Sequence, residues 1–117
     1  SRERLYTPSR VKRWLEELNK IKNVERIILF GSVLQKEIYN DVDVLFITNQ
    51  KIFSKLEHEI NDLNKINIKK IHPMYQSFED VIKNIKKSDK PILNAIKGIV
   101  VKGENKFLEV YNESSKE

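Results

Sequence analysis

Two runs of four consecutive apolar residues, Ile27–Phe30 and Val44–Ile47, are the longest apolar segments of the chain. Both are rich in β-branched or aromatic residues, and Gly31 stops the first, which is typical of short buried strands. A membrane-spanning helix needs about 20 apolar residues, so neither run can cross a bilayer. No apolar leader stands at the start of the chain. We therefore expect a soluble cytoplasmic protein with no membrane partner.

The chain has 117 residues and no cysteine. This length is typical of one domain, and a domain of this size buries enough apolar surface to fold without a metal or a disulfide. We expect one domain over residues 1–117, with its core at about 7–110. The absence of cysteine excludes disulfide bonds, zinc–cysteine sites and cysteine nucleophiles.

Helical and strand patterns alternate along the chain. Apolar residues recur at helical spacing from Val11 to Ile21, after a Thr7-Pro8 start in which Thr7 can cap and Pro8 suits the first helical position. We expect helices over 7–22, 53–63, 77–87, 89–98 and 104–112, a helical turn over 32–37, and strands over 24–30, 42–47, 66–72 and 99–102, with Pro73 ending the third strand. This order predicts an α/β fold in which one layer of sheet is covered by helices.

Charge is unevenly distributed along the chain. Residues 1–36 carry nine basic and four acidic side chains, and residues 68–102 carry eight and three. Residues 37–67 instead carry three basic and six acidic side chains. A solvated lysine-rich surface is one interpretation of this pattern. The other is an acidic, cation-binding centre between basic surfaces that attract phosphates, and composition does not choose between the two.

The most specific stretch is Leu29-Phe30-Gly31-Ser32, followed after eight residues by Asp41-Val42-Asp43-Val44. A glycine at the end of a strand lets the backbone approach a ligand, and the hydroxyl and N–H of Ser32 suit phosphate oxygens. Asp41 and Asp43 are two residues apart at the start of a strand, so both carboxylates point to one face. Oxygen ligands without cysteine or histidine favour a hard ion such as Mg²⁺. The pattern predicts metal-assisted phosphoryl or nucleotidyl transfer.

Each half of this pattern also has a purely structural interpretation. A Gly-Ser pair after a strand is commonly a turn, and Asp-x-Asp at a strand start often caps a loop. The combination of both halves, each next to an apolar strand, favours a site. Elsewhere, Trp14 is expected in the core, His58 on the surface and His72 in a structural role.

These residues resemble the nucleotidyltransferase family of the DNA polymerase beta superfamily, and most of all its minimal archaeal and bacterial members. The resemblance rests on Ile28–Ser32 and Asn40–Phe46, with a preceding helix and a closing segment Gly98–Gly103, and it covers roughly residues 7–110. It implies a mixed sheet with helices mainly on one face. It also implies transfer of NMP from an NTP to a hydroxyl acceptor, with ATP as the expected NTP.

The resemblance implies a role for each matched residue. Gly31 and Ser32 would bind the triphosphate, and Asp41 and Asp43 would ligate two Mg²⁺ ions as the catalytic metal ligands. The family's arginine and glycine between the two halves are missing here, and Lys36 is the candidate phosphate contact in their place. The family's third carboxylate, on a later strand, falls at or near Lys70, whose ammonium would partly neutralise the aspartates.

Two functions therefore stay open. The chain is an Mg²⁺-dependent nucleotidyltransferase, which the Asp41/Asp43 pair favours, or a catalytically impaired binding module, which Lys70 favours. The second kind would act as a partner or antitoxin of a nucleotide-binding or RNase-type protein encoded nearby, in a toxin–antitoxin pair. Nucleic-acid binding through the basic segments is a third possibility, but these segments lack the interleaved aromatic residues of single-strand readers.

Overall fold

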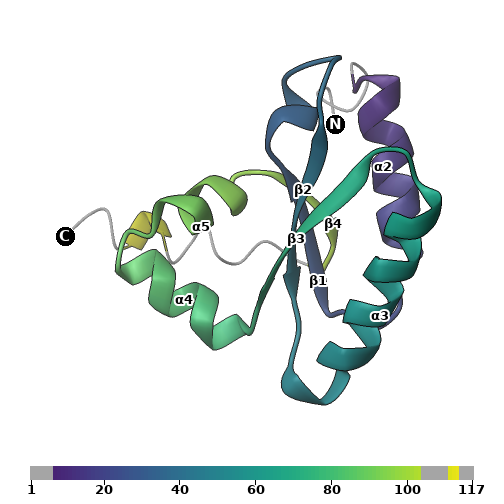
Figure 1. Ribbon diagram of the computed structural model, residues 1–117. Helices are drawn as coiled ribbons and strands as arrows, with labels where there is room; N and C mark the ends of the chain where they lie inside the picture. The colour runs from purple at the N-terminus through teal and green to yellow at the C-terminus, as the bar shows by residue number, and fades with distance from the viewer. Residues whose placement is uncertain (1–6, 104–110, 114–117) are drawn as a thin grey trace.

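The computed structural model describes residues 7–103 and 111–113, and its centre is a four-stranded mixed sheet (Figure 1). The strands stand in the order β3-β2-β1-β4. Strand β1 pairs antiparallel with both β2 and β4, while β2 and β3 are parallel. The bounds are Arg26–Phe30 for β1, Asp41–Ile47 for β2, Lys70–Gln76 for β3 and Ile99–Lys102 for β4. The expected α/β class with a mixed sheet is confirmed.

Helices cover both faces of this sheet, as Figure 1 shows. The helices α2 (Ser9–Asn19) and α3 (Gln50–Ile66) pack on one face, and α4 (Phe78–Lys86) and α5 (Lys90–Ala95) pack on the other. The two longer helices thus lie on one face, and the two shorter helices cover the other. The physical reason for cover on both faces is the pair of uninterrupted apolar runs in β1 and β2, because a strand without polar alternation needs cover on both sides.

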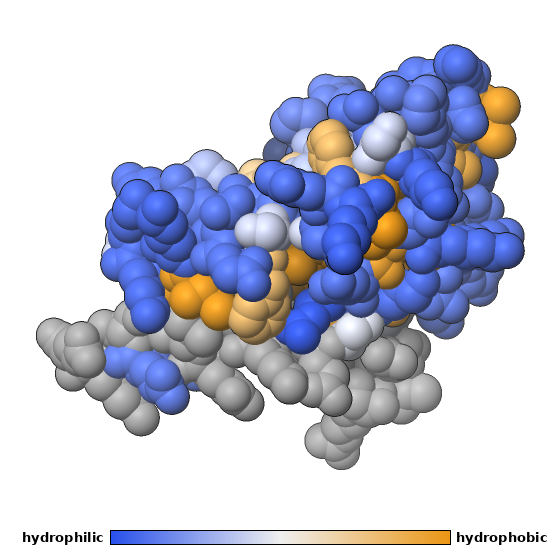
Figure 2. Space-filling view, turned by 90° about the horizontal axis from the view of Figure 1, so that it is seen from below, coloured by the Kyte–Doolittle hydropathy of each residue, from blue (hydrophilic) through white to orange (hydrophobic). Residues whose placement is uncertain are grey.

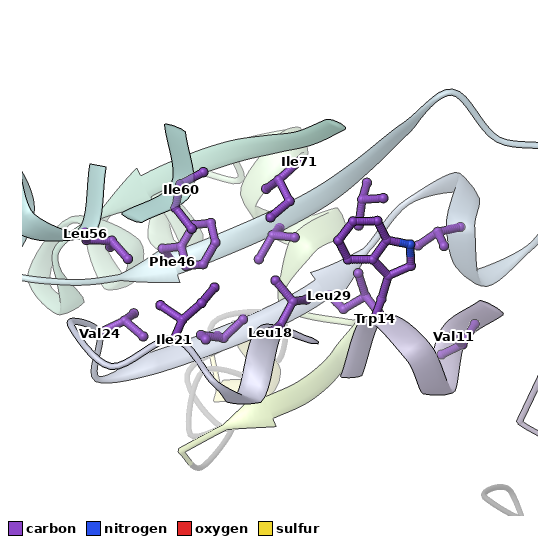
Figure 3. Packing of buried hydrophobic residues seen from close by; sticks show 14 residues of the cluster. Val11, Trp14, Leu18, Ile21, Val24, Leu29, Phe46, Leu56, Ile60 and Ile71 are labelled. Atoms are coloured by element: carbon purple, nitrogen blue, oxygen red, sulfur yellow. The ribbon is translucent and has the colours of Figure 1, made fainter. Parts of the chain in front are cut away.

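Two apolar clusters follow from the alternation of side chains along β1 and β2. Trp14 and Phe46 belong to the larger cluster, between the sheet and the α2/α3 layer (Figure 3). Trp14 is only 5% exposed, as expected for a core residue, and its Nε1–H donates a hydrogen bond of 3.0 Å to the Tyr39 hydroxyl. The cluster on the α4/α5 face contains Ile28, Phe30, Leu45, Ile47, Val81, Ile85, Ile92, Ala95 and Ile96.

The helix starts follow from local capping chemistry. The Asn49 side chain accepts from the N–H groups of Lys51 and Ile52 at the start of α3. Ser77 accepts from Asp80 N at 3.1 Å, and Asp89 accepts from Ile92 N at 3.2 Å, so these residues cap the starts of α4 and α5, as expected for helices beginning at 77 and 89. The first helix differs from the expectation, because its N-cap residue is Pro8 rather than Thr7.

The third strand differs from the expectation of 66–72. Helix α3 continues to Ile66, and β3 begins at Lys70 and runs through Pro73 to Gln76. Proline is tolerated here because β3 is an edge strand, where every second N–H points away from the neighbouring strand. The helix expected over 104–112 falls almost entirely outside the described residues. Among the residues that the structure describes, no helix has the length and apolarity to cross a membrane.

Candidate functional site

The strand register brings the sequence-predicted carboxylates to one end of the sheet. In β2, Asp43 stands opposite Phe30 of β1 and opposite His72 of β3. Both aspartates lie on the same face of β2 as Leu45, which belongs to the α4/α5 cluster. Asp41 is exposed, whereas the Asp43 side chain keeps only 29% of its surface exposed.

Gly31 lies directly against the Asp43 carboxylate. Its backbone has φ 86° and ψ −158°, a conformation that L side chains rarely adopt. A Cβ atom built at Gly31 would overlap Asp43 Oδ2. Two features therefore require glycine at position 31: the backbone conformation, and the space that the Asp43 carboxylate occupies.

His72 completes this group from the neighbouring strand. Its Nδ1 lies 3.1 Å from Asp43 Oδ1, and 74% of its side chain is exposed. From the sequence, His72 is expected in a structural role, on the same strand face as Lys70 by two-residue alternation. The register of β3 puts Lys70 and His72 in step with Asp41 and Asp43, which brings the imidazole to the Asp43 carboxylate.

Lys70 stands beside Asp41 in the strand register, but its ammonium points elsewhere. Lys70 Nζ donates to the backbone carbonyl of Asn64 and, at 2.8 Å, to that of Asn67. These carbonyls belong to the C-terminal end of α3, where unpaired C=O groups and the helix dipole favour a cation. The ammonium therefore binds the end of α3 and forms no ion pair with either aspartate.

The segment between the two halves of the pattern is anchored from α2 and from the start of β3. Residues Ser32–Leu34 form a single 3₁₀ turn, with Val33 buried. Arg10 Nε donates to the Val33 carbonyl at 2.8 Å, which holds a guanidinium next to the Gly31-Ser32 turn. Lys69 donates to the carbonyl of Tyr39, and its ammonium lies 5.1 Å from the centre of the Tyr39 ring. Lys36, the expected phosphate contact, is exposed just beyond the turn.

Within residues 7–103 and 111–113, no group of three histidine or acidic side chains is placed to hold a metal ion, so no third carboxylate of these residues joins the two aspartates. Asp62 forms an ion pair with Lys65 on α3 at 3.7 Å. Asp80 lies in the first turn of α4. The described oxygen donors at the site are thus the two carboxylates of β2.

A separate hollow of about 340 Å³ lies at the opposite end of β2 and β3, where α3 and α4 begin. Figure 2 views the molecule from this end and shows hydrophobic surface between two hydrophilic lobes. Tyr75 lies here, with its ring centroid 5.0 Å from that of Phe53. Burial, and secondarily the negative charge of Glu57, raise the pKa of Tyr75 to about 12. The hollow is lined by Thr48, Asn49, Gln50, Phe53, Tyr75, Gln76, Ser77 and Asp80.

No family model, curated protein or solved structure matches this chain. The geometry of the Gly31–Asp43–His72 group is therefore the basis for a functional proposal.

Proposed function

We propose that this chain is a nucleotidyltransferase domain that transfers NMP from an NTP to a hydroxyl acceptor with Mg²⁺. The observation that carries the proposal is the contact between Gly31 and Asp43. A backbone conformation suited to glycine, at the end of a buried strand, leaves room for a carboxylate of the neighbouring strand. Glycine adopts this conformation without steric cost, and it is the residue used where the backbone must approach another group or a ligand closely.

The donor set fits a hard cation. Asp41 and Asp43 present carboxylate oxygens on one face of β2 at an open end of the sheet. Mg²⁺ is commonly bound through one or two carboxylates, with water and phosphate oxygens as its other ligands. When bound, it would supply positive charge to the triphosphate and acidify the attacking hydroxyl.

The other residues at this end of the sheet have roles in binding the triphosphate. Gly31 and Ser32 offer close backbone approach and a hydroxyl, as the resemblance implies. The Arg10 guanidinium, held against the turn, and the exposed Lys36 supply positive charge for the phosphates. A cytoplasmic location, where ATP and Mg²⁺ are available, belongs to this proposal.

A second candidate is a nucleotide-binding module without transferase activity. His72 favours it, because an imidazole stands next to Asp43 where a third carboxylate would complete an acidic cluster. Such a module would work through a protein partner encoded nearby, as in a toxin–antitoxin pair. The two candidates share nucleotide binding and differ only in turnover.

Titration calorimetry with ATP, with Mg²⁺ or with EDTA, tests the shared part. We expect Mg²⁺-dependent binding that is lost in Asp43→Asn and weakened in Asp41→Asn. Asp62→Asn is the matched control, because it removes one carboxylate from α3 and leaves the site intact. Equal ATP affinity with EDTA and with Mg²⁺ would refute the proposal. Transfer of label from α-³²P-ATP to a hydroxyl acceptor then separates the enzyme from the binding module.

A further inference from the structure

Exposed lysines gather on the α4–α5 hairpin and the residues that follow it, residues 78–98. The whole segment carries five lysines and three acids, a net +2, and two of the acids stand at the start of α4. From residue 81 to residue 98 the segment carries five lysines and one aspartate, a net +4. All five lysines are exposed, and we call them the α4–α5 lysine patch: Lys83, Lys86, Lys87, Lys90 and Lys97.

Four of these lysines gather around the connection between the two helices. Lys83 and Lys86 lie in the last turn of α4, Lys87 is its C-cap residue, and Lys90 is the first residue of α5. Lys97 follows the other end of α5, about 10 Å further along by helical rise. A nucleic-acid strand presents one phosphate for about every 3.4 Å of its axis, so several phosphates can face this span.

No lysine of the patch forms an ion pair within residues 7–103 and 111–113, and the Lys97 ammonium lies 5.1 Å from the centre of the Tyr111 ring. The nearest acid in sequence, Asp89, accepts a hydrogen bond from Ile92 N as the cap of α5. The other acids of α4, Glu79 and Asp80, lie in its first turn, four and three residues before Lys83, and about 9 Å or more by helical rise from Lys86 and Lys87.

Helix stability explains only part of this clustering. The helix dipole favours Lys83 and Lys86 in the last turn of α4, but it disfavours Lys90 at the start of α5. Lys83 and Lys87 are also four residues apart, a spacing at which like charges repel along a helix. A charge arrangement that costs stability is expected where an anionic partner binds.

We propose that the α4–α5 lysine patch binds the phosphodiester backbone of nucleic acid. Residues 81–98 contain no aromatic side chain to stack on a base, so the contacts are to phosphates and independent of sequence. An anionic membrane fits less well, because membrane-surface helices insert large apolar side chains. The exposed large apolar residues of the described chain are Ile38, Ile66 and Ile68, none of which lies in the hairpin. In Figure 2, the left-hand lobe that α4 and α5 form is mostly hydrophilic on its outer surface.

The hairpin ends beside the candidate site. A Cβ atom at Gly98 would overlap the Leu29 carbonyl and lie 2.9 Å from Phe30 Cβ, so the chain leaving α5 crosses the last residues of β1. Gly31 follows directly. A strand bound along the patch therefore extends toward the Gly31-Ser32 turn, where one of its hydroxyl groups is the acceptor; this last step alone rests on the proposed function.

Fluorescence anisotropy with a labelled DNA duplex of about 20 base pairs tests the patch. The patch variant carries Lys83→Gln, Lys86→Gln, Lys87→Gln and Lys90→Gln. The control variant carries Lys12→Gln, Lys22→Gln, Lys51→Gln and Lys55→Gln, which are exposed positions outside the hairpin, so both variants lose the same charge. We expect the affinity of the patch variant to fall about 10-fold or more at about 50 mM salt, and the salt slope to decrease by about one for each phosphate that a lysine no longer neutralises. The affinity of the control should change less than about threefold.

Three outcomes would overturn the proposal: equal losses of affinity in both variants, no binding of the duplex by the wild-type chain at low salt, or binding of anionic lipid vesicles in preference to the duplex. Circular dichroism checks the fold of each variant, and the double variant Lys87→Gln/Lys90→Gln provides a milder test, with an intermediate loss expected. Asp43→Asn should bind the duplex like the wild type. Loss of ATP binding in Asp43→Asn tests the proposed function, whereas loss of duplex binding in the patch variant tests this inference, so the two proposals can fail separately.

Discussion

Asp43 and His72 face each other across the parallel strands β2 and β3, with the imidazole Nδ1 3.1 Å from the carboxylate Oδ1. The carboxylate of Asp43 is enclosed between this ring and the bare backbone of Gly31. This pair occupies the end of the sheet where the proposed site lies, so substitutions of the pair and of its neighbours should have measurable effects on stability and metal binding.

His72→Asp places a second carboxylate against Asp43. Two carboxylates at this distance repel, so we expect the variant to unfold about 0.5–1 kcal/mol more easily without divalent ions, a modest loss because His72 is exposed. Mg²⁺ should restore this loss and bind more tightly than to the wild type, because three carboxylates then meet. Thermal melts with and without Mg²⁺ measure both effects. His58→Asp, on the exposed side of α3, should show neither, and an Mg²⁺-insensitive His72→Asp variant would contradict the placement of the pair.

Gly31→Ala should destabilise the protein by about 2–4 kcal/mol. The positive φ costs about 1–2 kcal/mol for an L residue, and overlap with Asp43 adds to it. Gly103→Ala shares the positive φ, at 85°, but a Cβ there would lie 2.6 Å from Arg26 Cγ, so it does not isolate the backbone cost. Gly31→Ala in the Asp43→Ala background isolates it, and we expect the loss in urea unfolding to fall there toward about 1–2 kcal/mol, the cost of the positive φ alone. An equal loss in both backgrounds would exclude a specific clash with Asp43.

Lys70→Gln removes the cation from the C-terminal end of α3. Because its ammonium binds the carbonyls of Asn64 and Asn67, we expect a loss of about 0.5–1 kcal/mol in stability. The Mg²⁺ affinity of the aspartates should change little in calorimetry. Lys65→Gln, whose partner is the exposed Asp62, should be close to neutral in both assays. A large gain in Mg²⁺ affinity in Lys70→Gln would show that the ammonium reaches Asp41 instead.

The raised pKa of Tyr75 predicts a loss of folding stability at alkaline pH. Its pKa is raised by burial, and secondarily by Glu57, to about 12, against an ordinary value of 10.0. The unfolded chain therefore ionises first, so the stabilisation is complete below pH 10 and disappears as the pH rises toward 12. We expect the free energy of unfolding to fall by up to about 1.4 kcal/mol per pH unit in this window from this group alone. Urea unfolding of the wild type and of Tyr75→Phe at several pH values isolates the effect, which would be refuted by parallel curves.

The amino-acid sequence by itself determined the local features of this protein. The apolar runs set β1 and β2, and Ser77 and Asp89 set the starts of α4 and α5, because propensity and capping act within a few residues. The sequence also placed Gly31 at the end of one strand and Asp41 and Asp43 at the start of the next. The same uninterrupted runs agree with the cover that the helices give to both faces of the sheet.

Only the tertiary structure decided which side chains meet. The register of β3 against β2 brings His72 to Asp43, and the end of α3 draws the Lys70 ammonium away from Asp41, although both residues lie about 30 positions from their strand partners. The register depends on packing of the whole strand, including its passage through Pro73, and the lysine depends on carbonyls that a helix end exposes. Such contacts join segments far apart in the chain, so their energy is decided by the fold rather than by the neighbours in sequence.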